Sequence, residues 1–128
     1  LGMIFMVHIA DPDSWFSVKY ADTSVYGVKW SHYEALEKQL RRFDNPWIGA
    51  HLCGAPEHLD FVSQLLERHP NLYLDTGAAK WMVRELSKHS RPELLDFFAR
   101  WRGRILFGSD IVTTDDHLRY TAPGEGIA

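Results

Sequence analysis

The sequence predicts an α/β fold in which four parallel strands alternate with helices. Four short apolar runs, each bounded by turn residues, are typical of buried strands. They span residues 3–10, 47–54, 71–77 and 104–110. Helical patterns separate these runs, an alternation that favours right-handed crossovers and a parallel sheet. Each run also carries one histidine or aspartate near its carboxyl end, the end of parallel α/β sheets where ligands bind.

The composition suits one globular domain spanning residues 1–128, with 45% hydrophobic residues. A net charge of -3 argues weakly against nucleic acid or a membrane as partner. The single cysteine, Cys53, excludes an internal disulfide and a cysteine-based zinc site, and it is compatible with a cytoplasmic location. Because Leu1 lies inside an apolar run, we expect a missing N-terminal portion, and we expect residues 118–128 to be frayed.

The first strand leads into a long segment, residues 11–29, that we predict to be a loop. Its opening Asp11-Pro12 pair disfavours helix. Its aromatic residues are Trp15, Phe16, Tyr20 and Tyr26, followed by Trp30. These rings either pack over the sheet edge, which we favour, or contact substrate, because loops of this length are often functional.

Four helices are predicted around and between the remaining strands. Ser31 and Glu34 have the spacing of a capping box at the start of the first. Pro56 suits the first turn of the second, and Pro70 ends it. The predicted helices span residues 31–43, 56–69, 79–88 and 92–101.

The candidate site consists of His8, His51, Asp75 and Asp110, one near the end of each strand. A parallel sheet with its strands in sequence order would bring these side chains together. Imidazole and carboxylate are ligands that suit zinc, manganese or iron. Taken singly, each histidine could be a hydrogen-bonded structural residue and Asp110 a turn residue. We favour a turn or supporting role beside the metal ligands for Asp75.

The other polar candidates receive structural interpretations. We expect Cys53 to be a small buried residue, because no base is paired with it in the sequence. The remaining histidines fall on predicted helices or tails, and we expect them to be solvated. They are His32, His58, His69, His89 and His117.

Four sequence blocks carry a family resemblance. They are Val7-His8-Ile9, Ala50-His51-Leu52-Cys53-Gly54, residues 69–77 (HPNLYLDTG) and residues 104–110 (RILFGSD). The blocks resemble the C-terminal half of the amidohydrolase-related metal-dependent hydrolases, a TIM-barrel group that includes acyclic hydrolases and metal-dependent decarboxylases. The resemblance covers about residues 3–110, and the last two blocks are the most specific.

The resemblance implies a partial TIM barrel comprising strands five to eight. It makes His8 a metal ligand, His51 a ligand or the histidine that polarises the substrate, and Asp110 a ligand that also shuttles the proton. Asp75 falls on the seventh strand without a defined role. The implied activity is hydrolysis of a C–N or C–O bond in a small molecule, or non-oxidative decarboxylation of a small carboxylic acid. Zinc is the expected metal, with manganese as the second choice.

The sequence departs from the family at its start. The family's His-x-His pair on the first barrel strand is absent, as are four βα units of a barrel that needs roughly 250 residues. We therefore expect this chain alone to be inactive, to bind metal weakly, and to associate through its open edge strands. The alternative interpretation is a non-catalytic α/β module that binds an anion or another small ligand at the same strand ends.

Overall fold

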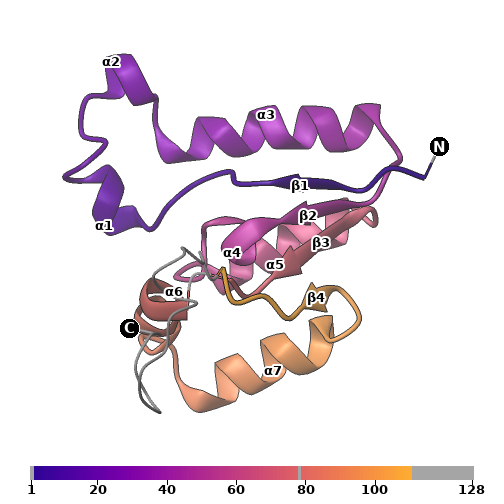
Figure 1. The fold of residues 1–128 in the computed structure, drawn as a ribbon. Helices are drawn as coiled ribbons and strands as arrows, with labels where there is room; N and C mark the ends of the chain where they lie inside the picture. The colour runs from indigo at the N-terminus through magenta and orange to yellow at the C-terminus, as the bar shows by residue number, and fades with distance from the viewer. Residues whose placement is uncertain (1, 78, 111–128) are drawn as a thin grey trace, which may run out of the picture.

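The computed structural model describes residues 2–77 and 79–110. Within these residues, four parallel strands form one sheet in the order β1-β2-β3-β4 (Figure 1). The strands are β1 (Phe5–Val7), β2 (Trp47–Gly49), β3 (Leu72–Asp75) and β4 (Ile105–Leu106). The predicted strand order and direction are therefore confirmed.

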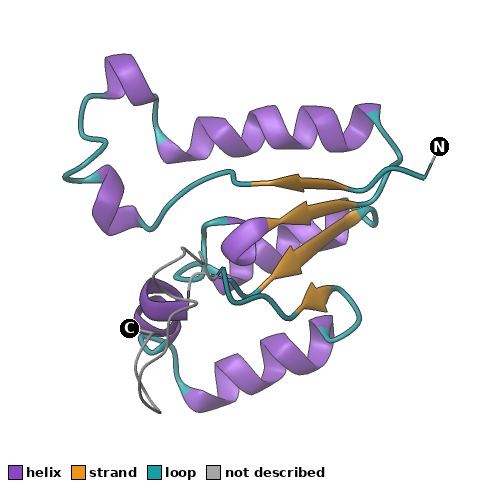
Figure 2. Ribbon diagram, in the orientation of Figure 1, coloured by secondary structure: helices purple, strands orange, loops and turns teal. Residues whose placement is uncertain are grey.

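In the described residues, the helices lie between successive strands along the chain (Figure 2). They are α1 (Asp13–Phe16), α2 (Thr23–Tyr26), α3 (Lys29–Arg42), α4 (Ala50–Cys53), α5 (Leu59–Arg68), α6 (Ala79–Leu86) and α7 (Arg91–Trp101). In Figure 1, α3 runs along β1, α7 runs beside β4, and α5 lies behind the two central strands. This arrangement of strands and covering helices is that of part of a TIM barrel. In the described part of the chain, no helix is both long enough and apolar enough to span a membrane.

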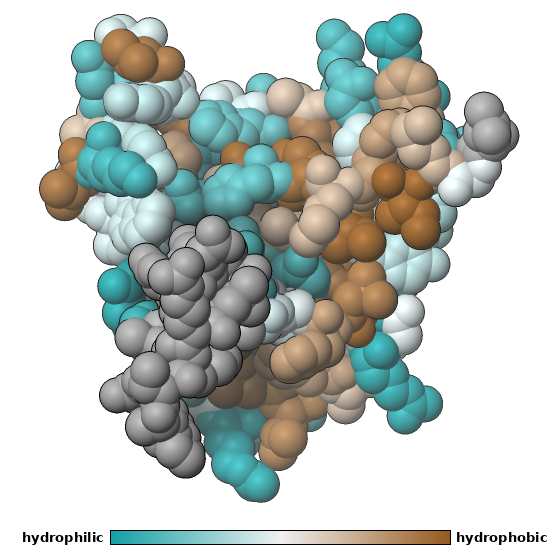
Figure 3. Space-filling model, in the orientation of Figure 1, coloured by the Kyte–Doolittle hydropathy of each residue, from teal (hydrophilic) through white to brown (hydrophobic). Residues whose placement is uncertain are grey.

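One face of the sheet packs against the helices and forms the core. Leu72 and Leu74 of β3 are fully buried there with residues of α3 and α5. The opposite face is less covered, because Met6 of β1 and Leu106 of β4 are largely exposed. Met6 lies opposite Ile48 in the register. Apolar side chains gather on the side of the molecule seen in Figure 3. In a closed barrel, the face opposite the helices would be the interior.

The predicted capping box at Ser31 is wrong. The helix α3 already begins at Lys29, so the hydroxyl of Ser31 lies inside its first turn and donates to the carbonyl oxygen of Val28. A capping box forms instead before α7, where the hydroxyl of Ser90 accepts from the amide of Glu93 and the Glu93 carboxylate accepts from the amide of Ser90. Both pairs have the same sequence spacing, so the pattern alone could not distinguish them.

Three further boundaries differ from the sequence prediction. The predicted loop at residues 11–29 contains the single-turn helices α1 and α2. The second strand ends at Gly49, because the chain turns away from the sheet at His51. The helix expected from Pro56 begins at Leu59. The predicted frayed tail, residues 118–128, lies outside the described residues, as does His117.

Candidate functional site

The four predicted site residues all lie at the carboxyl end of the sheet. His8 directly follows β1, His51 follows β2 by two residues, Asp75 ends β3, and Asp110 lies four residues beyond β4. All four line one concavity of about 600 Å³. Its other lining residues are Met6, Ile48, Ala50, Leu106, Phe107 and Gly108. The predicted convergence of strand ends is therefore present in the structure.

Gly77 is the common neighbour of three of these residues. A β-carbon built on Gly77 would lie 3.2 Å from Nδ1 of His51, 3.3 Å from Oδ1 of Asp75 and 3.2 Å from the β-carbon of Asp110. These contacts are tight, so a larger residue at position 77 would push the three side chains apart. The ring of His8 approaches the same group from β1, with 5.0 Å between its centroid and that of His51.

The backbone that carries His51 is unusual. His51, Leu52 and Cys53 have φ angles of 57°, 51° and 56°, and Gly54 continues the run at 69°. The element α4 is therefore a left-handed turn, and side chains disfavour this conformation by roughly 1–2 kcal/mol per residue. We call residues 51–54 the left-handed turn. Its first residue is the one that the sequence assigns to chemistry.

Asp75 contacts the left-handed turn through its carboxylate. Oδ1 of Asp75 accepts hydrogen bonds from the backbone amides of His51, at 2.8 Å, and Gly77, at 3.0 Å. The side chain is buried. Burial, with a smaller contribution from the charge of Asp75, raises the pKa of the Cys53 thiol to about 12. Cys53 is therefore a protonated, fully buried residue, as the sequence analysis expected.

The imidazole of His51 has one nitrogen that the fold leaves unsatisfied. Nδ1 is buried and has no hydrogen-bond partner among the described residues. The ring packs against those of His8 and Trp81, the second at a centroid distance of 5.6 Å. Buried polar atoms almost always have a partner, so an unpaired one calls for an explanation such as an ion, a water or a ligand.

His8 is held from the side of α1. Its Nε2 lies 3.2 Å from Oδ1 of Asp11, and the hydroxyl of Tyr20 donates to the other oxygen of Asp11 at 2.8 Å. The ring of Tyr20 in turn packs against Phe16 and Tyr26, each at a centroid distance of 5.2 Å. The aromatic residues after the first strand therefore pack on one another and form a wall beside His8.

The donor chemistry of His8, His51 and Asp110 suits a divalent metal, and the unpaired Nδ1 of His51 fits the same role. Their donor atoms do not, however, all approach within 4.8 Å of one another in the described residues. The structure thus brings these residues to one concavity but not into a compact ligand set.

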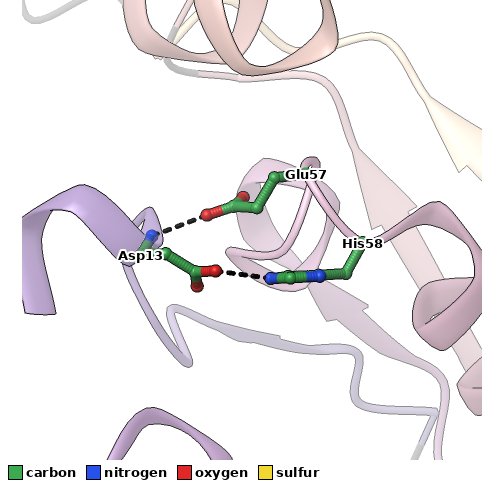
Figure 4. A group of neighbouring side chains, drawn as sticks. All are labelled: Asp13, Glu57 and His58. Atoms are coloured by element: carbon green, nitrogen blue, oxygen red, sulfur yellow. Dashed lines mark hydrogen bonds and ion pairs between the residues drawn. The ribbon is translucent and has the colours of Figure 1, made fainter. Parts of the chain in front are cut away.

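A compact group of metal-capable side chains occurs instead at Asp13, Glu57 and His58 (Figure 4). Nε2 of His58 lies 2.5 Å from Oδ2 of Asp13, and the amide of Asp13 donates to Oε1 of Glu57 at 2.6 Å. The buried ammonium of Lys29 lies 2.7 Å from Asp13 and 3.3 Å from Glu57. One cation therefore already contacts both carboxylates, and we interpret the group as an ionic link between α1 and the segment before α5.

This ionic link also sets the protonation of Asp13. Partial burial opposes ionisation, but hydrogen bonds from Lys29 and His58 outweigh it and lower the pKa of Asp13. The sequence analysis missed the link. Its only signal was that Asp13 and the pair Glu57–His58 follow two neighbouring strands, as the site residues do.

The prediction that the other histidines are solvated is wrong for His69, whereas His32, His58 and His89 are half-buried. His69 is buried beside Glu37, with 3.0 Å between Nε2 and Oε2. His58 pairs with Asp13 as above. His32 and His89 contact backbone carbonyl oxygens through their rings. An imidazole ring can form hydrogen bonds with protein groups as well as with water. The position of a histidine on a predicted helix therefore did not reveal these contacts.

Comparison with known proteins supports the sequence resemblance. A family model described as amidohydrolase matches residues 1–124, almost the whole chain. No curated protein and no solved structure matches the chain.

Proposed function

Because the chain belongs to the amidohydrolase family, we propose that the concavity at the carboxyl end of its sheet is part of a divalent-metal hydrolase or decarboxylase site. The observation that carries the proposal is the buried, unpaired Nδ1 of His51 in a concavity that His8 and Asp110 also line. The substrate would be a small molecule with a C–N or C–O bond, or a small carboxylic acid. Zinc is the metal that we favour, with manganese second.

The roles follow from the chemistry of each side chain. His8, His51 and Asp110 would hold the ion, which when bound lowers the pKa of water to about 7. The carboxylate of Asp110 would accept the proton of the attacking water, because it is the exposed carboxylate of the concavity. The imidazole of His51 would bind the ion or polarise a substrate carbonyl. Asp75, whose Oδ1 already accepts two amides, would support the site without binding the ion.

We further propose that four additional βα units complete the barrel. The described sheet has four strands, and β1 and β4 form its edges, whereas a TIM barrel closes with eight. Strong zinc binding generally needs three or four protein ligands. This chain alone should therefore bind zinc weakly and associate through its edge strands, and the completed barrel should bind zinc tightly.

Metal titration tests this proposal. Zinc or manganese would be titrated calorimetrically into the 128-residue chain and into the completed barrel, and each product analysed for metal by mass spectrometry. Tight binding by the completed barrel that is lost in His51→Asn would support the ligand assignment. Sub-micromolar zinc affinity in the 128-residue chain would show that the ligands are assigned wrongly. Phosphate binding without metal-dependent turnover would favour the alternative, a non-catalytic anion-binding module.

A further inference from the structure

The left-handed turn needs an explanation of its own. Three of the four non-glycine residues with positive φ in the described part of the chain are consecutive, and they are His51, Leu52 and Cys53. Side chains in this region persist only where the surrounding structure determines the backbone, and such residues cluster at functional sites. The question is which groups hold the turn and what its conformation achieves.

We propose that Tyr33 and Asp75 are positioning residues that hold the left-handed turn and thereby direct the imidazole of His51 into the concavity. The chemical role of His51 in this inference rests on the proposed function, whereas its position does not. The position of His51, and the two groups that fix it, can be tested without any metal or substrate.

Asp75 fixes the start of the turn. Its Oδ1 accepts the amide of His51 and the amide of Gly77, so one oxygen joins the segment after β2 to the segment after β3. Both donors are neutral amides, and the interaction requires an acceptor atom in this place rather than a negative charge. An asparagine could present its side-chain oxygen in the same position, whereas a leucine could not.

Tyr33 fixes the end of the turn from α3. Its hydroxyl donates to the carbonyl oxygen of Cys53 at 2.7 Å, and both residues are buried. Burial raises the pKa of Tyr33, so the hydroxyl stays protonated and remains a donor. Without this donor the carbonyl would be buried and unsatisfied, and the backbone would gain by rotating away from the left-handed region.

Two glycines leave space for the turn. A β-carbon on Gly54 would lie 1.9 Å from the carbonyl oxygen of Ala10, and one on Gly49 would lie 2.0 Å from Sγ of Cys53. The turn is therefore packed directly on the backbone that follows β1, next to His8. The hydrogen bonds to Asp75 and Tyr33, together with the close packing at Gly49 and Gly54, determine its conformation.

The product of this arrangement is a side chain with an unused nitrogen. The carbonyl oxygens of the first two residues of the turn are paired: the amide of Gly54 donates to the His51 carbonyl at 2.9 Å, and the amide of Ala55 donates to the Leu52 carbonyl at 3.3 Å. Nδ1 of His51, by contrast, is buried without a partner among the described residues. The strained backbone therefore directs the His51 ring into the concavity, but it does not give Nδ1 a hydrogen-bond partner.

Nuclear magnetic resonance of the 128-residue chain, labelled with ¹⁵N, tests the inference. The signals to follow are the backbone amide and the two ring nitrogens of His51. The variants are Asp75→Asn, Asp75→Leu and Tyr33→Phe. The matched control is Tyr73→Phe, which removes a hydroxyl with no hydrogen bond in the described structure. We expect Asp75→Leu and Tyr33→Phe to shift the His51 signals. Asp75→Asn should shift them less than Asp75→Leu, and Tyr73→Phe should leave the ring signals in place.

The outcomes separate positioning from other roles. Unchanged His51 signals in folded Tyr33→Phe would overturn the proposal, and this conservative variant decides the matter even if Asp75→Leu does not fold. Asp75→Asn that disturbs the ring as strongly as Asp75→Leu would also overturn it, since charge would then be essential. In the completed barrel, loss of positioning should lower zinc affinity about 10- to 100-fold. The absence of zinc binding in every form would refute the proposed function and leave the positioning result intact.

Discussion

At the amino end of the sheet, side chains satisfy the backbone carbonyls of the surrounding elements, whereas at the carboxyl end the backbone is strained and His51 keeps a buried ring nitrogen unpaired among the described residues. Asn71 illustrates the amino end. Its Nδ2 donates to the carbonyl oxygens of Leu40, Phe43 and Asn45 at 2.9–3.3 Å. One side chain therefore ends α3 and fixes the entry into β2.

Arg104, which precedes β4, likewise binds the carbonyl oxygens at the end of α5 and at the start of β3. It donates to the carbonyl oxygen of Leu72 through Nε at 2.7 Å and to that of His69 at 2.6 Å. His69 and Arg68 both bind Glu37 of α3, which links α5 to α3. All these charged and polar groups bind protein partners and connect one helix or strand to another.

If the proposed site is correct, reactivity belongs to the carboxyl end of the sheet, as in a βα barrel, whereas the connecting side chains of the amino end contribute to stability. Both ends contain histidine and carboxylate. What differs is the state of the two buried histidines: His69 pairs with Glu37, whereas His51 keeps one ring nitrogen without a partner among the described residues. Substitution of an exposed side chain in the concavity should therefore affect turnover more than stability, and substitution of a side chain that connects elements at the amino end should do the reverse.

The largest expected effect is that of Asp110→Asn on turnover. In the completed, metal-loaded barrel, the amide cannot accept a proton from water, so the rate should fall on the order of 10²- to 10⁴-fold. Because Asp110 is exposed, the free energy of unfolding should change little. Release of product from a p-nitrophenyl ester, or of carbon dioxide from a carboxylic acid, measures the rate. Asp44→Asn makes the same change in an exposed residue at the amino end and should be neutral. Full activity of Asp110→Asn would end the proposed mechanism.

The next effect concerns the close packing of the left-handed turn on the backbone of Ala10. Gly54→Ala places a methyl group 1.9 Å from the carbonyl oxygen of Ala10 at a φ of +69°, so the backbone must move. We expect a loss of about 3 kcal/mol or more in the free energy of unfolding, measured by urea denaturation. Gly103→Ala is the control, because a β-carbon there meets nothing within 4 Å, and it should change stability by less than about 0.5 kcal/mol. Equal stability of both variants would show that the turn accommodates side chains freely.

The sequence predicted the sheet and the convergence of the site, because both depend on regular patterns. Apolar runs of strand length alternate with helical periodicity, and this alternation permits few topologies. His8, His51, Asp75 and Asp110 were placed at one end by strand direction alone, and they line one concavity.

The remaining features depend on tertiary contacts that no local pattern encodes. The turn at His51 is left-handed because of an oxygen of Asp75 and the hydroxyl of Tyr33, whereas in the sequence the apolar residues after Gly49 continue the run that predicts the strand. The burial of His69 depends likewise on Glu37, which lies thirty-two residues earlier. Each contact joins segments whose proximity follows only from the assembled fold.

Asn71→Ala tests the amino end directly. The substitution leaves three carbonyl oxygens without their shared donor, and we expect a loss of about 2 kcal/mol in the free energy of unfolding. The ring signals of His51 should not move, because the site is at the other end of the sheet. Asn45→Ala, which removes a single hydrogen bond to the carbonyl oxygen of Met3, should cost less. A shift of the His51 signals in Asn71→Ala would show that the two ends are coupled.

The smallest expected effect is the acid sensitivity of the amino end. The hydrogen bond from Arg68, with a further contribution from His69, outweighs burial and lowers the pKa of Glu37 from 4.5 to about 2. A lowered folded-state pKa stabilises the fold above the unfolded-state pKa, and this contribution is lost as the pH falls from about 5 to 2. Solvent access to Arg68 limits it to about 1 kcal/mol. Urea midpoints measured across this pH range should therefore fall further for the wild type than for Glu37→Gln, whereas Glu34→Gln, an exposed change on the same helix, should follow the wild type. Parallel curves for the wild type and Glu37→Gln would mean that the ionised carboxylate does not link α3 to α5.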